Sequence, residues 1–370
     1  TTDLEVRSST LLGRAITKGN NMLKDLKKLE IINNKSLNSL FSSTSLNDIN
    51  QHCKFFNGEF YLDSFNYFPV TVNYETFYSL FKKDDNNSLE HFYTKEFYQN
   101  IIEKKNDFKV IKNSLVLGSS PADNYFSNLI HFFPRIFFTN EKKINLIIHR
   151  NLSNKFRSFI KSICQMRDID ITFSFIDDGF YKFENSSIPQ FLNINNSINI
   201  LKFFIDKILV GKDAPRFKSK IYIRREDANY RKVLNEADLI EKLRNQGFEV
   251  INPHHYEILD QMKIFSSAEV IISPHGSNLS NIIFCNKGAK IIEISPPFNN
   301  PYEKNISARY QNLSKNMSLE FTKIISDTVN VDNHSDLAKK YINKNILNES
   351  DYYKNMILKV SKIDNIINSL

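Results

Sequence analysis

The sequence predicts an α/β protein whose helices alternate with the strands of parallel sheets. From Lys220 to Ile294, short β-branched runs alternate with amphipathic segments, giving the order β, α, β, α, β, α, β. A second alternation of the same kind begins at Ser114 and continues to Ile176. Lys-Asp-Ala-Pro at 212–215 separates the two and is the best candidate for a linker. Strands that alternate with helices indicate parallel sheets, because each helix returns the chain to the start of the next strand.

The alternation between Lys220 and Ile294 has clear element boundaries. Asn235 is a suitable N-cap for a helix that Gly247 ends. Pro274 breaks a β-branched run, and Asn286-Lys287-Gly288 forms a turn. The expected elements, in chain order, are strand 220–225, the helix after Asn235, strand 248–251, helix 258–268, strand 270–273, helix 279–284 and strand 291–294.

The first half of the chain is divided less sharply. Residues 1–50 have a partly amphipathic helical pattern, and short aromatic strands are expected within 58–80. The expected elements that follow are strands 115–117, 144–149 and 171–176, and helices 122–138 and 154–166. The tail from Asp332 has the composition of one or two polar helices. These patterns divide the chain into segments 1–50, 51–211, 216–325 and 326–370.

Composition narrows the class of protein. The chain has 370 residues, 41% of them hydrophobic, which is enough for two domains with real cores. Cys53, Cys164 and Cys285 are too few and too far apart for a disulfide framework or a zinc site, so a reducing compartment is expected. The net charge of +8 suits anionic ligands or a membrane surface, but the basic residues are mixed with acidic ones and form no nucleic-acid motif. No run of 18 apolar residues occurs, and a first residue that is not Met suggests that a leader or anchor has been removed.

His275-Gly276-Ser277-Asn278 is the most informative loop of the sequence, because it joins a predicted strand to a predicted helix. A helix N-terminus has unpaired N–H groups and a partial positive charge, and is therefore a natural anion site. Gly276 and Ser277 would let a phosphate approach the backbone, and His275 can add a hydrogen-bond donor. The alternative is an ordinary βαβ turn in which the small residues only make the bend.

Three arginines lie upstream, near the end of a predicted parallel strand. Arg224 and Arg225 end that strand, and Arg231 follows seven residues after Arg224. Ligands bind at the carboxyl ends of strands in such sheets, where the loop at His275 is also expected. Strand-end arginines are usually solvated charges, but three of them opposite a helix-start loop indicate a diphosphate site.

These motifs together resemble glycosyltransferase family 61. The relevant residues are I-x-R-R…R-x-x-x-N-E, then Gln261, then P-H-G-S-N-L-S-N-I-I-F, then G-A-x-I-I-E-I. The family includes eukaryotic protein O-linked N-acetylglucosaminyltransferases, plant xylan-modifying enzymes and bacterial capsule or lipopolysaccharide proteins. Its usual motif is H-G-A-G-L-T-N, so this chain departs from it at Ser277 and Asn278. The resemblance is specific over about 220–296.

A second segment, N-Y-F-S-N-L-I-H-F-F-P-R-I at 124–136, is similar to the family pattern N-Y-x-H-W-L-x-D-x-L-P-R-L. The chain departs from that pattern at Ser127, Asn128 and His131, where the family has His, often Trp, and commonly an acid. Positions 127 and 131 share one face of an α-helix. If the acidic position is catalytic in relatives, His131 would have to take its role. The alternative is that His131 only packs among phenylalanines.

The resemblance implies two Rossmann-like domains of the GT-B kind that face a cleft, followed by C-terminal helices. Segment 51–211 would be the acceptor side and 216–325 the domain that binds the nucleotide sugar. The implied function is inverting transfer of a hexose or pentose from a nucleoside diphosphate sugar, UDP above all, to an oligosaccharide or lipid-linked glycan. Synthesis of capsule or lipopolysaccharide in a bacterial cytoplasm, also at the inner face of the membrane, fits this function. No metal and no cofactor besides the donor are expected.

The residues that carry this function follow from the matched motifs. His131 is the expected base for the acceptor hydroxyl, Asp123 is the next candidate, and His275 acts on the leaving group. Glu293 would accept hydrogen bonds from ribose hydroxyls. The residues expected to bind the donor are Arg224, Arg225, Arg231, His275, Gly276, Ser277, Asn278, Asn281 and Glu293.

Other classes fit less well. Asp168-Ile169-Asp170 has the form of a metal-binding D-x-D, but it precedes a strand, and Asp177-Asp178-Gly179 is interpreted as a hairpin turn. The nine glycines never form G-x-G-x-x-G, and no G-x-S-x-G occurs, which argues against dinucleotide oxidoreductases and serine hydrolases. The strongest alternative is a catalytically inactive module that binds a glycan or nucleotide, which the departures at Ser127 and His131 favour.

Overall fold

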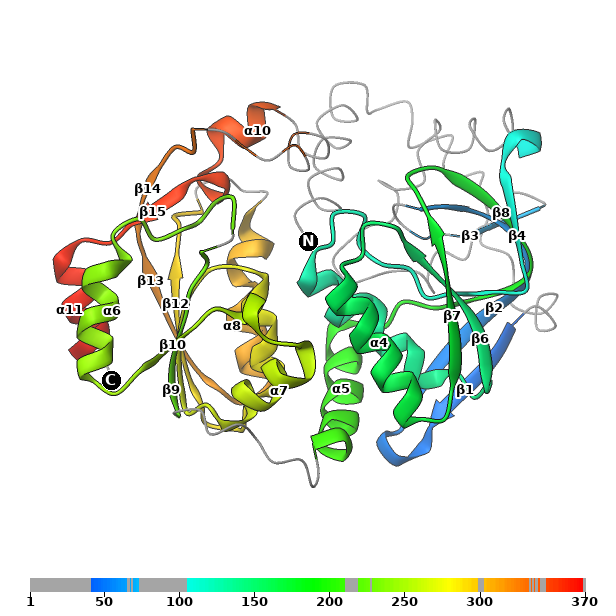
Figure 1. The fold of residues 1–370 in the computed structure, drawn as a ribbon, viewed down its shortest axis with the longest axis horizontal. Coiled ribbons are helices and arrows are strands. Elements are labelled where there is room, and N and C mark those ends of the chain that lie inside the picture. The colour runs from blue at the N-terminus through cyan, green and yellow to red at the C-terminus, as the bar shows by residue number, and fades with distance from the viewer. Residues whose placement is uncertain are drawn as a thin grey trace. The chain divides into compact units, whose positions relative to one another are not determined.

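The structure is a computed structural model, and it divides into two compact units, Thr1–Leu201 and Lys202–Leu370 (Figure 1). Each unit contains one large β-sheet. The predicted linker at 212–215 and residues 1–40 of the predicted helical segment lie outside the described residues. The predicted cleft between two domains stays a prediction. The residues that the structure describes are 41–64, 67, 69–72, 105–209, 219–226, 228–298, 303–332, 334, 336, 339 and 344–368.

The second unit contains a parallel sheet of five strands. These are β9 (Lys220–Ile223), β10 (Glu249–Ile251), β11 (Val270–Pro274), β12 (Lys290–Ser295) and β13 (Glu320–Ile325). Their order is β10-β9-β11-β12-β13, and every pairing is parallel. The strand order therefore changes direction between β9 and β11. The crevice outside the carboxyl ends of strands at such a point is where sheets of this kind bind ligands.

Helices cover both faces of this sheet. On one face lie α6 (Glu236–Asn245) and α11 (Val360–Asn368), and on the other lie α7 (Ile258–Ser267) and α8 (Lys304–Asn316) (Figure 1). The segment after β11 is a 3-10 helix, η8 (Ser277–Phe284), where an α-helix was expected. The helices pack through apolar stripes that match the helical period. Leu239 and Leu243 of α6 join Ile363 and Ile366 of α11 in one core with the sheet.

Asn235 precedes α6, as predicted, but its side chain does not cap the helix. Its Nδ2 donates to the Leu358 carbonyl oxygen at 2.7 Å, and its Oδ1 accepts from the Leu358 N–H at 2.9 Å. Both polar groups of the Asn235 side chain are therefore hydrogen-bonded to the backbone of Leu358, 123 residues later. An N-cap is predicted from the local sequence only, so the prediction does not include a competing hydrogen-bond partner so far along the chain.

The first unit confirms the α/β class but not two matching parallel sheets. Its strands are β1 (Phe41–Leu46), β2 (Gln51–Asp63), β3 (Pro69–Thr71), β4 (Lys109–Lys112), β5 (Leu115–Val116), β6 (Lys143–His149), β7 (Asp170–Ile176) and β8 (Phe180–Pro189). The strand order is β1-β2-β8-β5-β6-β7. The pairs β1–β2 and β2–β8 are antiparallel, while β8–β5–β6–β7 are parallel. The sheet is mixed because β1 and β2 are joined by a short turn, η1 (Asn47–Ile49), which permits only antiparallel pairing.

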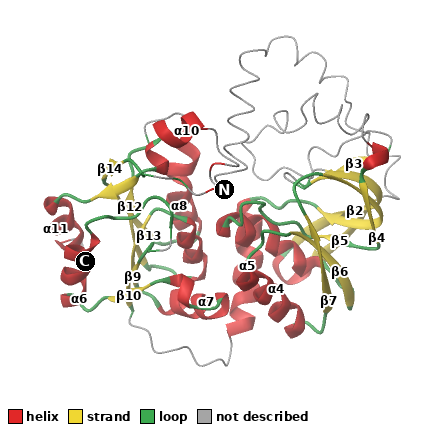
Figure 2. Cartoon of the chain, turned by 45° about the horizontal axis from the view of Figure 1, so that its top comes forward, coloured by secondary structure: helices red, strands yellow, loops and turns green. Residues whose placement is uncertain are grey.

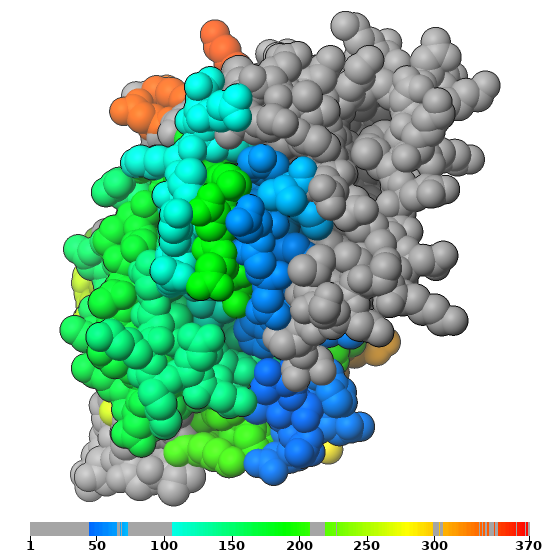
Figure 3. All heavy atoms as spheres, turned by 90° about the vertical axis from the view of Figure 1, so that its right-hand side faces the viewer, coloured from blue at the N-terminus to red at the C-terminus, as the bar shows by residue number. Residues whose placement is uncertain are grey.

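The antiparallel part of this sheet corrects the expectation of a helical segment up to residue 50, since residues 41–46 form β1. Distant parts of the sequence meet here. β2 lies beside β8, and the two are joined by backbone pairs from Phe55–Pro189 to Asp63–Phe180 (Figure 3). Phe60 of β2 stacks on Phe183 of β8 with ring centroids 5.2 Å apart, which places the aromatic core over this pairing.

Residues 177–179 connect β7 to β8 but do not form the predicted β-hairpin. β5 and β6 lie between these two strands in the sheet, so β7 and β8 are not neighbours. The turn is held by other contacts: the Asp177 N–H donates to the Tyr181 hydroxyl at 2.9 Å, and the Gly179 N–H to the Ser64 hydroxyl at 2.9 Å. A D-D-G sequence marks a turn, but it does not say which strands pair.

The helical segments of the first unit differ in type. α4 (Asn154–Met166) has the predicted range, and its N-cap Ser153 accepts from the Phe156 N–H. The predicted helix 122–138 begins later, as a π-helix, η5 (Ser127–Phe132), that continues as a 3-10 helix, η6 (Phe133–Phe138). A short 3-10 turn, η4 (Lys105–Asp107), precedes β4, and α5 (Ile194–Leu209) follows β8 (Figure 2). π-helical turns are rare and often occur at functional sites.

The C-terminal segment contains strands as well as the predicted helices. α10 (Lys344–Glu349) and the 3-10 turn η10 (Asp351–Tyr353) precede β15 (Asn355–Ile357), which pairs antiparallel with β14 (Asp327–Val329). β15 also forms a bridge with the chain before α6, at Val233 and Met356. Within the described ranges, no helix is both long and apolar enough to cross a membrane.

Candidate functional site

His275 and Glu293 form the centre of the candidate site in the second unit. They come from the ends of neighbouring strands, since Ser273 of β11 pairs with Glu293 of β12 and the His275 N–H donates to the Ile294 carbonyl. Their side chains are 1% and 0% exposed, and His275 Nδ1 is hydrogen-bonded to Glu293 Oε1. His275 Nε2 is therefore the ring nitrogen left for a ligand, and it has no hydrogen-bond partner among the described residues.

Three aromatic rings surround the His275 imidazole. Tyr310 lies 5.0 Å away between ring centroids, Phe298 lies 5.1 Å away and Tyr352 lies 5.8 Å away, each at a steep angle. They come from α8, the loop after β12 and η10, respectively. A shell of rings excludes water, so charges inside it interact more strongly than they would in solvent.

Four cationic side chains lie around this pair: Arg225, Arg231, Arg309 and Lys323. Lys323 Nζ is 3.7 Å from Glu293 Oε2, and Arg231 is only 4% exposed. Within the described part of the chain, Arg231 Nε and Nη1 and Arg225 Nε have no hydrogen-bond partner. Buried N–H donors without a partner are costly, so their convergence with His275 Nε2 fits an anion with several oxygen atoms.

The pKa shifts agree with an excess of positive charge. Burial lowers the pKa of His275 well below its ordinary value, and Arg231, Arg309, Arg225 and Lys323 lower it further. Burial and then repulsion by Arg231 lower the pKa of Arg225 to about 10. Burial raises the pKa of Glu293 to about 7, although Lys323 and Arg231 oppose this. Near neutral pH the single carboxyl group therefore cancels little of the arginine charge.

Gly276 leaves room for a side chain of the protein itself, and its predicted role in phosphate approach stays a prediction. Its φ of 171° and ψ of 168° describe extended backbone that any residue adopts. A Cβ atom at this position, however, would lie 1.7 Å from Nη1 of Arg225. The glycine therefore makes room for an arginine of the protein itself, which reaches the loop from the end of β9.

Arg224 points away from this cluster. Its Nη2 is 2.7 Å from Glu236 Oε1 at the start of α6, and its Nη1 is 3.3 Å from Glu226 Oε2. Tyr222 donates its hydroxyl hydrogen to the other oxygen of Glu236 at 3.0 Å. The structure thus brings Arg225 and Arg231 to His275, and pairs Arg224 with two carboxylates instead. The proposed role of Arg224 in donor binding stays a prediction.

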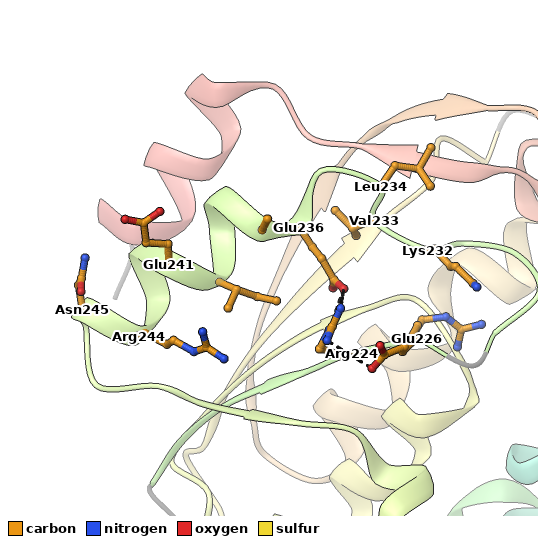
Figure 4. A pocket seen from close by; sticks show the side chains of 12 residues that line it. Arg224, Glu226, Lys232, Val233, Leu234, Glu236, Glu241, Arg244 and Asn245 are labelled. Atoms are coloured by element: carbon orange, nitrogen blue, oxygen red, sulfur yellow. Dashed lines mark hydrogen bonds and ion pairs between the residues drawn. The ribbon is translucent and has the colours of Figure 1, made fainter.

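A groove of about 840 Å³ runs along α6, and Arg224 is paired with its carboxylates within it (Figure 4). Arg225 also lines the groove, which therefore adjoins the cationic cluster. The remaining lining residues are Glu226, Lys232, Val233, Leu234, Glu236, Ala237, Ile240, Glu241, Arg244 and Asn245. Both charge signs and an apolar wall are present, so this groove lacks the one-sided positive charge of the site at His275.

Asn281 has a supporting position. It is buried, and its Nδ2 donates to Gln261 Oε1 at 2.9 Å. Gln261 in turn donates to the carbonyl oxygens of Pro253 and Tyr256, at 2.9 and 3.1 Å. These bonds tie η8 to η7 (Pro253–His255), the turn after β10. Ser277 and Asn278 are half-buried at the start of η8, next to Gly276.

The predicted catalytic residues of the first unit lie around the carboxyl end of β5. Asp123 is half-buried in a left-handed conformation, with φ of 50°. Asn128 Nδ2 donates to its Oδ1 at 3.0 Å, while Asn128 Oδ1 accepts from the Ser120 N–H at 2.7 Å. Burial raises the pKa of Asp123 to about 6. Asn128, one of the departures from the family pattern, therefore orients this carboxyl group.

His131 lies deeper than Asp123. It is 7% exposed, and its ring packs at a steep angle against Phe126, with centroids 5.6 Å apart. Phe126 and His131 are five residues apart, and they meet because this turn is a π-helix. The sequence predicts an α-helix here, in which residues three or four apart meet. Arg135, which matches the family pattern, is fully buried and donates to the Pro189 carbonyl at 2.8 Å.

His149 was missed by the sequence reasoning. It ends β6, is buried, and its Nε2 lies 3.2 Å from Asp178 Oδ1. Its Nδ1 accepts from the Asn151 N–H at 3.2 Å, so the hydrogen is on Nε2 and points to Asp178. Both ring nitrogens are used within the fold, which makes His149 a structural residue. Its position at the end of a predicted strand was the one feature of the sequence that could have identified His149 as a candidate.

We expect Glu293→Gln to reduce the pH dependence of stability. A carboxyl group with a raised pKa binds its proton more tightly in the folded protein, so its contribution is full below about pH 4.5 and is lost as the pH rises through about 7. The variant lacks this titration. Its free energy of unfolding should therefore improve relative to wild type, between pH 5 and pH 8, by on the order of 3 kcal/mol. Urea unfolding across this range measures the effect, and parallel curves for the two proteins would contradict it.

Comparisons with known proteins relate this chain to one class of protein, the glycosyltransferases. The model of the family Glycosyltransferase 61 matches residues 122–292, and this confirms the resemblance predicted from the sequence. The chain is also similar to protein O-linked-mannose beta-1,4-N-acetylglucosaminyltransferase 2 of Xenopus tropicalis, with 26% identity over 127 residues. The match covers 33% of this chain and 22% of that relative.

Among the side chains of the site that lie beyond the matched range are Arg309, Tyr310, Lys323 and Tyr352. No motif in the sequence marks them, because α8, β13 and η10 bring them to His275 only in the folded chain. The D-x-D sequence at 168–170 lies at the start of β7, with both carboxylates exposed. Among the described residues, no group of three or more potential ligands could hold a metal ion.

Proposed function

We propose that this protein transfers a sugar, with inversion, from a nucleoside diphosphate sugar to a glycan acceptor, and that UDP is the nucleotide. The observation that carries the proposal is the buried cluster at the ends of β9, β11 and β12. Its unsatisfied donors on Arg225, Arg231 and His275 suit a diphosphate. The family match adds support, because glycosyltransfer is the chemistry that its name describes.

Fixed cations would serve the chemical step directly. As the bond from the anomeric carbon to the β-phosphate oxygen breaks, the leaving diphosphate gains negative charge. Arg225 and Arg231 are held in place before this happens, so they stabilise the charge without reorganising. His275 Nε2 adds a donor when protonated Glu293 donates to Nδ1, and burial favours that protonation because it raises the pKa of Glu293 to about 7. We propose that these groups take the part that a divalent ion plays in other glycosyltransferases.

The acceptor hydroxyl needs a base, and we propose Asp123 in preference to His131. A pKa of about 6 leaves the Asp123 carboxyl group largely ionised at neutral pH, yet more basic than an ordinary aspartate. It is also half-buried, whereas His131 is 7% exposed and packs against Phe126. Asp123 would take the proton of the hydroxyl as its oxygen attacks the anomeric carbon.

The biological setting is proposed on composition and family. A net charge of +8 favours anionic donors, anionic glycans and anionic lipid surfaces. We propose an oligosaccharide or lipid-linked acceptor in the synthesis of a bacterial capsule or lipopolysaccharide. The protein would act in the cytoplasm, where sugar nucleotides are made, and at the inner face of the membrane.

Titration with nucleotides tests the donor assignment. In a buffer containing EDTA, we expect UDP to bind with micromolar to millimolar affinity, as donors of such enzymes commonly do. Binding should weaken as salt is added, because the cluster is cationic. Calorimetry with UDP, GDP and CMP in parallel measures both effects. Binding of GDP or CMP in place of UDP would overturn the UDP assignment, and binding that needs manganese would overturn the metal-free one.

A second candidate function is a catalytically inactive module that binds a nucleotide or glycan. The observation that favours it is the departure from the family pattern at Ser127 and His131. The two functions differ in one measurement. The module would bind UDP but would release no UDP from a UDP-sugar in the presence of any acceptor, whereas the enzyme would release UDP at a rate that depends on the acceptor.

A further inference from the structure

We propose that the C-terminal segment 350–358 is an integral part of the anion site, and that Tyr352 is the positioning residue that orients Arg231 and His275. The inference rests on the proposed function of this site as the place where a diphosphate binds. It adds residues that lie outside the matched range of 122–292 and that no sequence motif marks.

Backbone bonds fasten the Arg231 loop to this segment. The Arg231 N–H donates to the Lys354 carbonyl at 2.8 Å, and the Met356 N–H donates to the Lys232 carbonyl at 2.8 Å. The Leu234 N–H completes the ladder by donating to the Met356 carbonyl at 2.9 Å. The side chain of Asn235 adds two bonds to Leu358. The loop before α6 is thus paired like a strand with residues more than 120 positions later.

The Arg231 backbone needs this support. Its φ of 59° is in the left-handed region, which a residue with a long side chain rarely adopts. Such a conformation persists only where the surrounding structure imposes it. Here the bond that Arg231 donates to Lys354 and the bond that Lys232 accepts from Met356 impose it, and they direct the guanidinium group toward His275.

Tyr352 then fixes the guanidinium itself. The Arg231 Cζ atom lies 3.8 Å from the centre of the Tyr352 ring, and the same ring packs against His275. Tyr352 is 3% exposed, and its N–H donates to the Ser350 hydroxyl at 3.1 Å. Ser350 in turn donates to Glu303 at the start of α8. The ring therefore has a fixed position between the two groups that we assign to phosphate binding.

The stacking leaves the donors of Arg231 available. A guanidinium group carries its N–H bonds in its own plane, and a ring over its face does not compete for them. Nε and Nη1 are the two nitrogens without a hydrogen-bond partner among the residues described. The Tyr352 hydroxyl also forms a side-chain hydrogen bond with Arg231, and Nε and Nη1 stay available beside it.

The experiment compares the full-length protein and its variants in calorimetric titrations with inorganic pyrophosphate. Tyr352→Leu removes the ring but keeps apolar bulk, and Tyr352→Phe keeps the ring but removes the hydroxyl. We expect Tyr352→Leu to weaken pyrophosphate binding by about 5- to 30-fold, the range of a desolvated cation–π contact. Tyr352→Phe should restore most of the affinity. Phe248→Leu is the matched control, because Phe248 is also buried but packs in the core with α6 and α11.

Arg231→Lys provides an independent variant if Tyr352→Leu fails to fold. Lysine keeps the charge but has no planar edge to orient. We expect a loss like that of Tyr352→Leu, and no further loss when Arg231→Lys is combined with Tyr352→Phe. Equal pyrophosphate affinity of wild type and Tyr352→Leu would overturn the inference, and so would a loss in Phe248→Leu as large as that in Tyr352→Leu. If the wild type binds no pyrophosphate, the proposed function of the site fails as well.

Discussion

Replacing Gly276 by alanine should abolish most donor binding while the protein remains folded. The new Cβ atom would fall 1.7 Å from Nη1 of Arg225, a distance that no two non-bonded atoms tolerate. The atom that must move is the end of a flexible side chain and not backbone, so the guanidinium should leave and the loop should stay. Losing one charge-assisted contact corresponds to about 10- to 150-fold weaker UDP binding. Calorimetry with UDP measures this loss, and thermal unfolding shows whether the fold persists.

A double variant shows whether Arg225 is the cause. Arg225→Ala should weaken UDP binding by a similar factor, and adding Gly276→Ala to it should change little, since the clash no longer exists. Arg224→Ala is the matched control, because this neighbouring arginine is paired with Glu236 and Glu226. Losses that multiply in the double variant would show that Gly276 acts through something other than Arg225.

Replacing Asp123 by asparagine should lower turnover by roughly 10²- to 10⁴-fold, the usual contribution of a general base. Asparagine keeps the shape of the side chain and an oxygen that can accept from Asn128 Nδ2, so the loop should remain in place. In the wild type, turnover should fall as the pH drops through about 6, because protonation removes the base. Initial rates of UDP release between pH 5 and pH 8 test both effects.

His131→Gln is the companion variant for this test. The sequence predicts that His131 is the base, whereas the buried position against Phe126 leads us to propose a packing role. We expect His131→Gln to retain turnover within about threefold wherever its melting temperature is close to that of wild type. A large loss in this variant, together with full activity of Asp123→Asn, would return the role to His131. UDP affinity should be unchanged in both variants.

The second unit could be predicted well from the sequence because its signals are local. A β-branched run ended by Pro274 and an amphipathic run ended by Gly247 define a strand and a helix within a few residues. The elements β9, α6, α7, β11 and β12 lie close to the expected ranges. The placement of Arg225, Arg231 and His275 at carboxyl ends also follows from parallel topology alone. The sequence pattern could not predict where each side chain points. Arg224 and Arg225 are adjacent, yet Arg224 points to α6 and Arg225 points to Gly276.

Contacts between distant segments account for the rest. Arg309, Lys323 and Tyr352 reach His275 through the packing of α8, β13 and η10, which no spacing reveals. The antiparallel pairing of β2 with β8 joins residues more than a hundred positions apart. The burial of Glu293 and its contacts with His275 and Lys323 also depend on the folded chain, and its role at the ribose stays a prediction.

The ladder that joins Arg231 to Lys354 and Met356 also sets the order in which activity can arise during synthesis. A ribosome that has released the chain as far as Ile325 has delivered all five strands of the second sheet, with His275, Glu293 and every arginine of the site. Tyr352 and the backbone that holds Arg231 follow later. Since domains begin to fold as they emerge, the sheet can form first, while the nascent chain still lacks the residues that orient its phosphate donors. We therefore expect donor binding to begin only after residues 350–358 have left the ribosome.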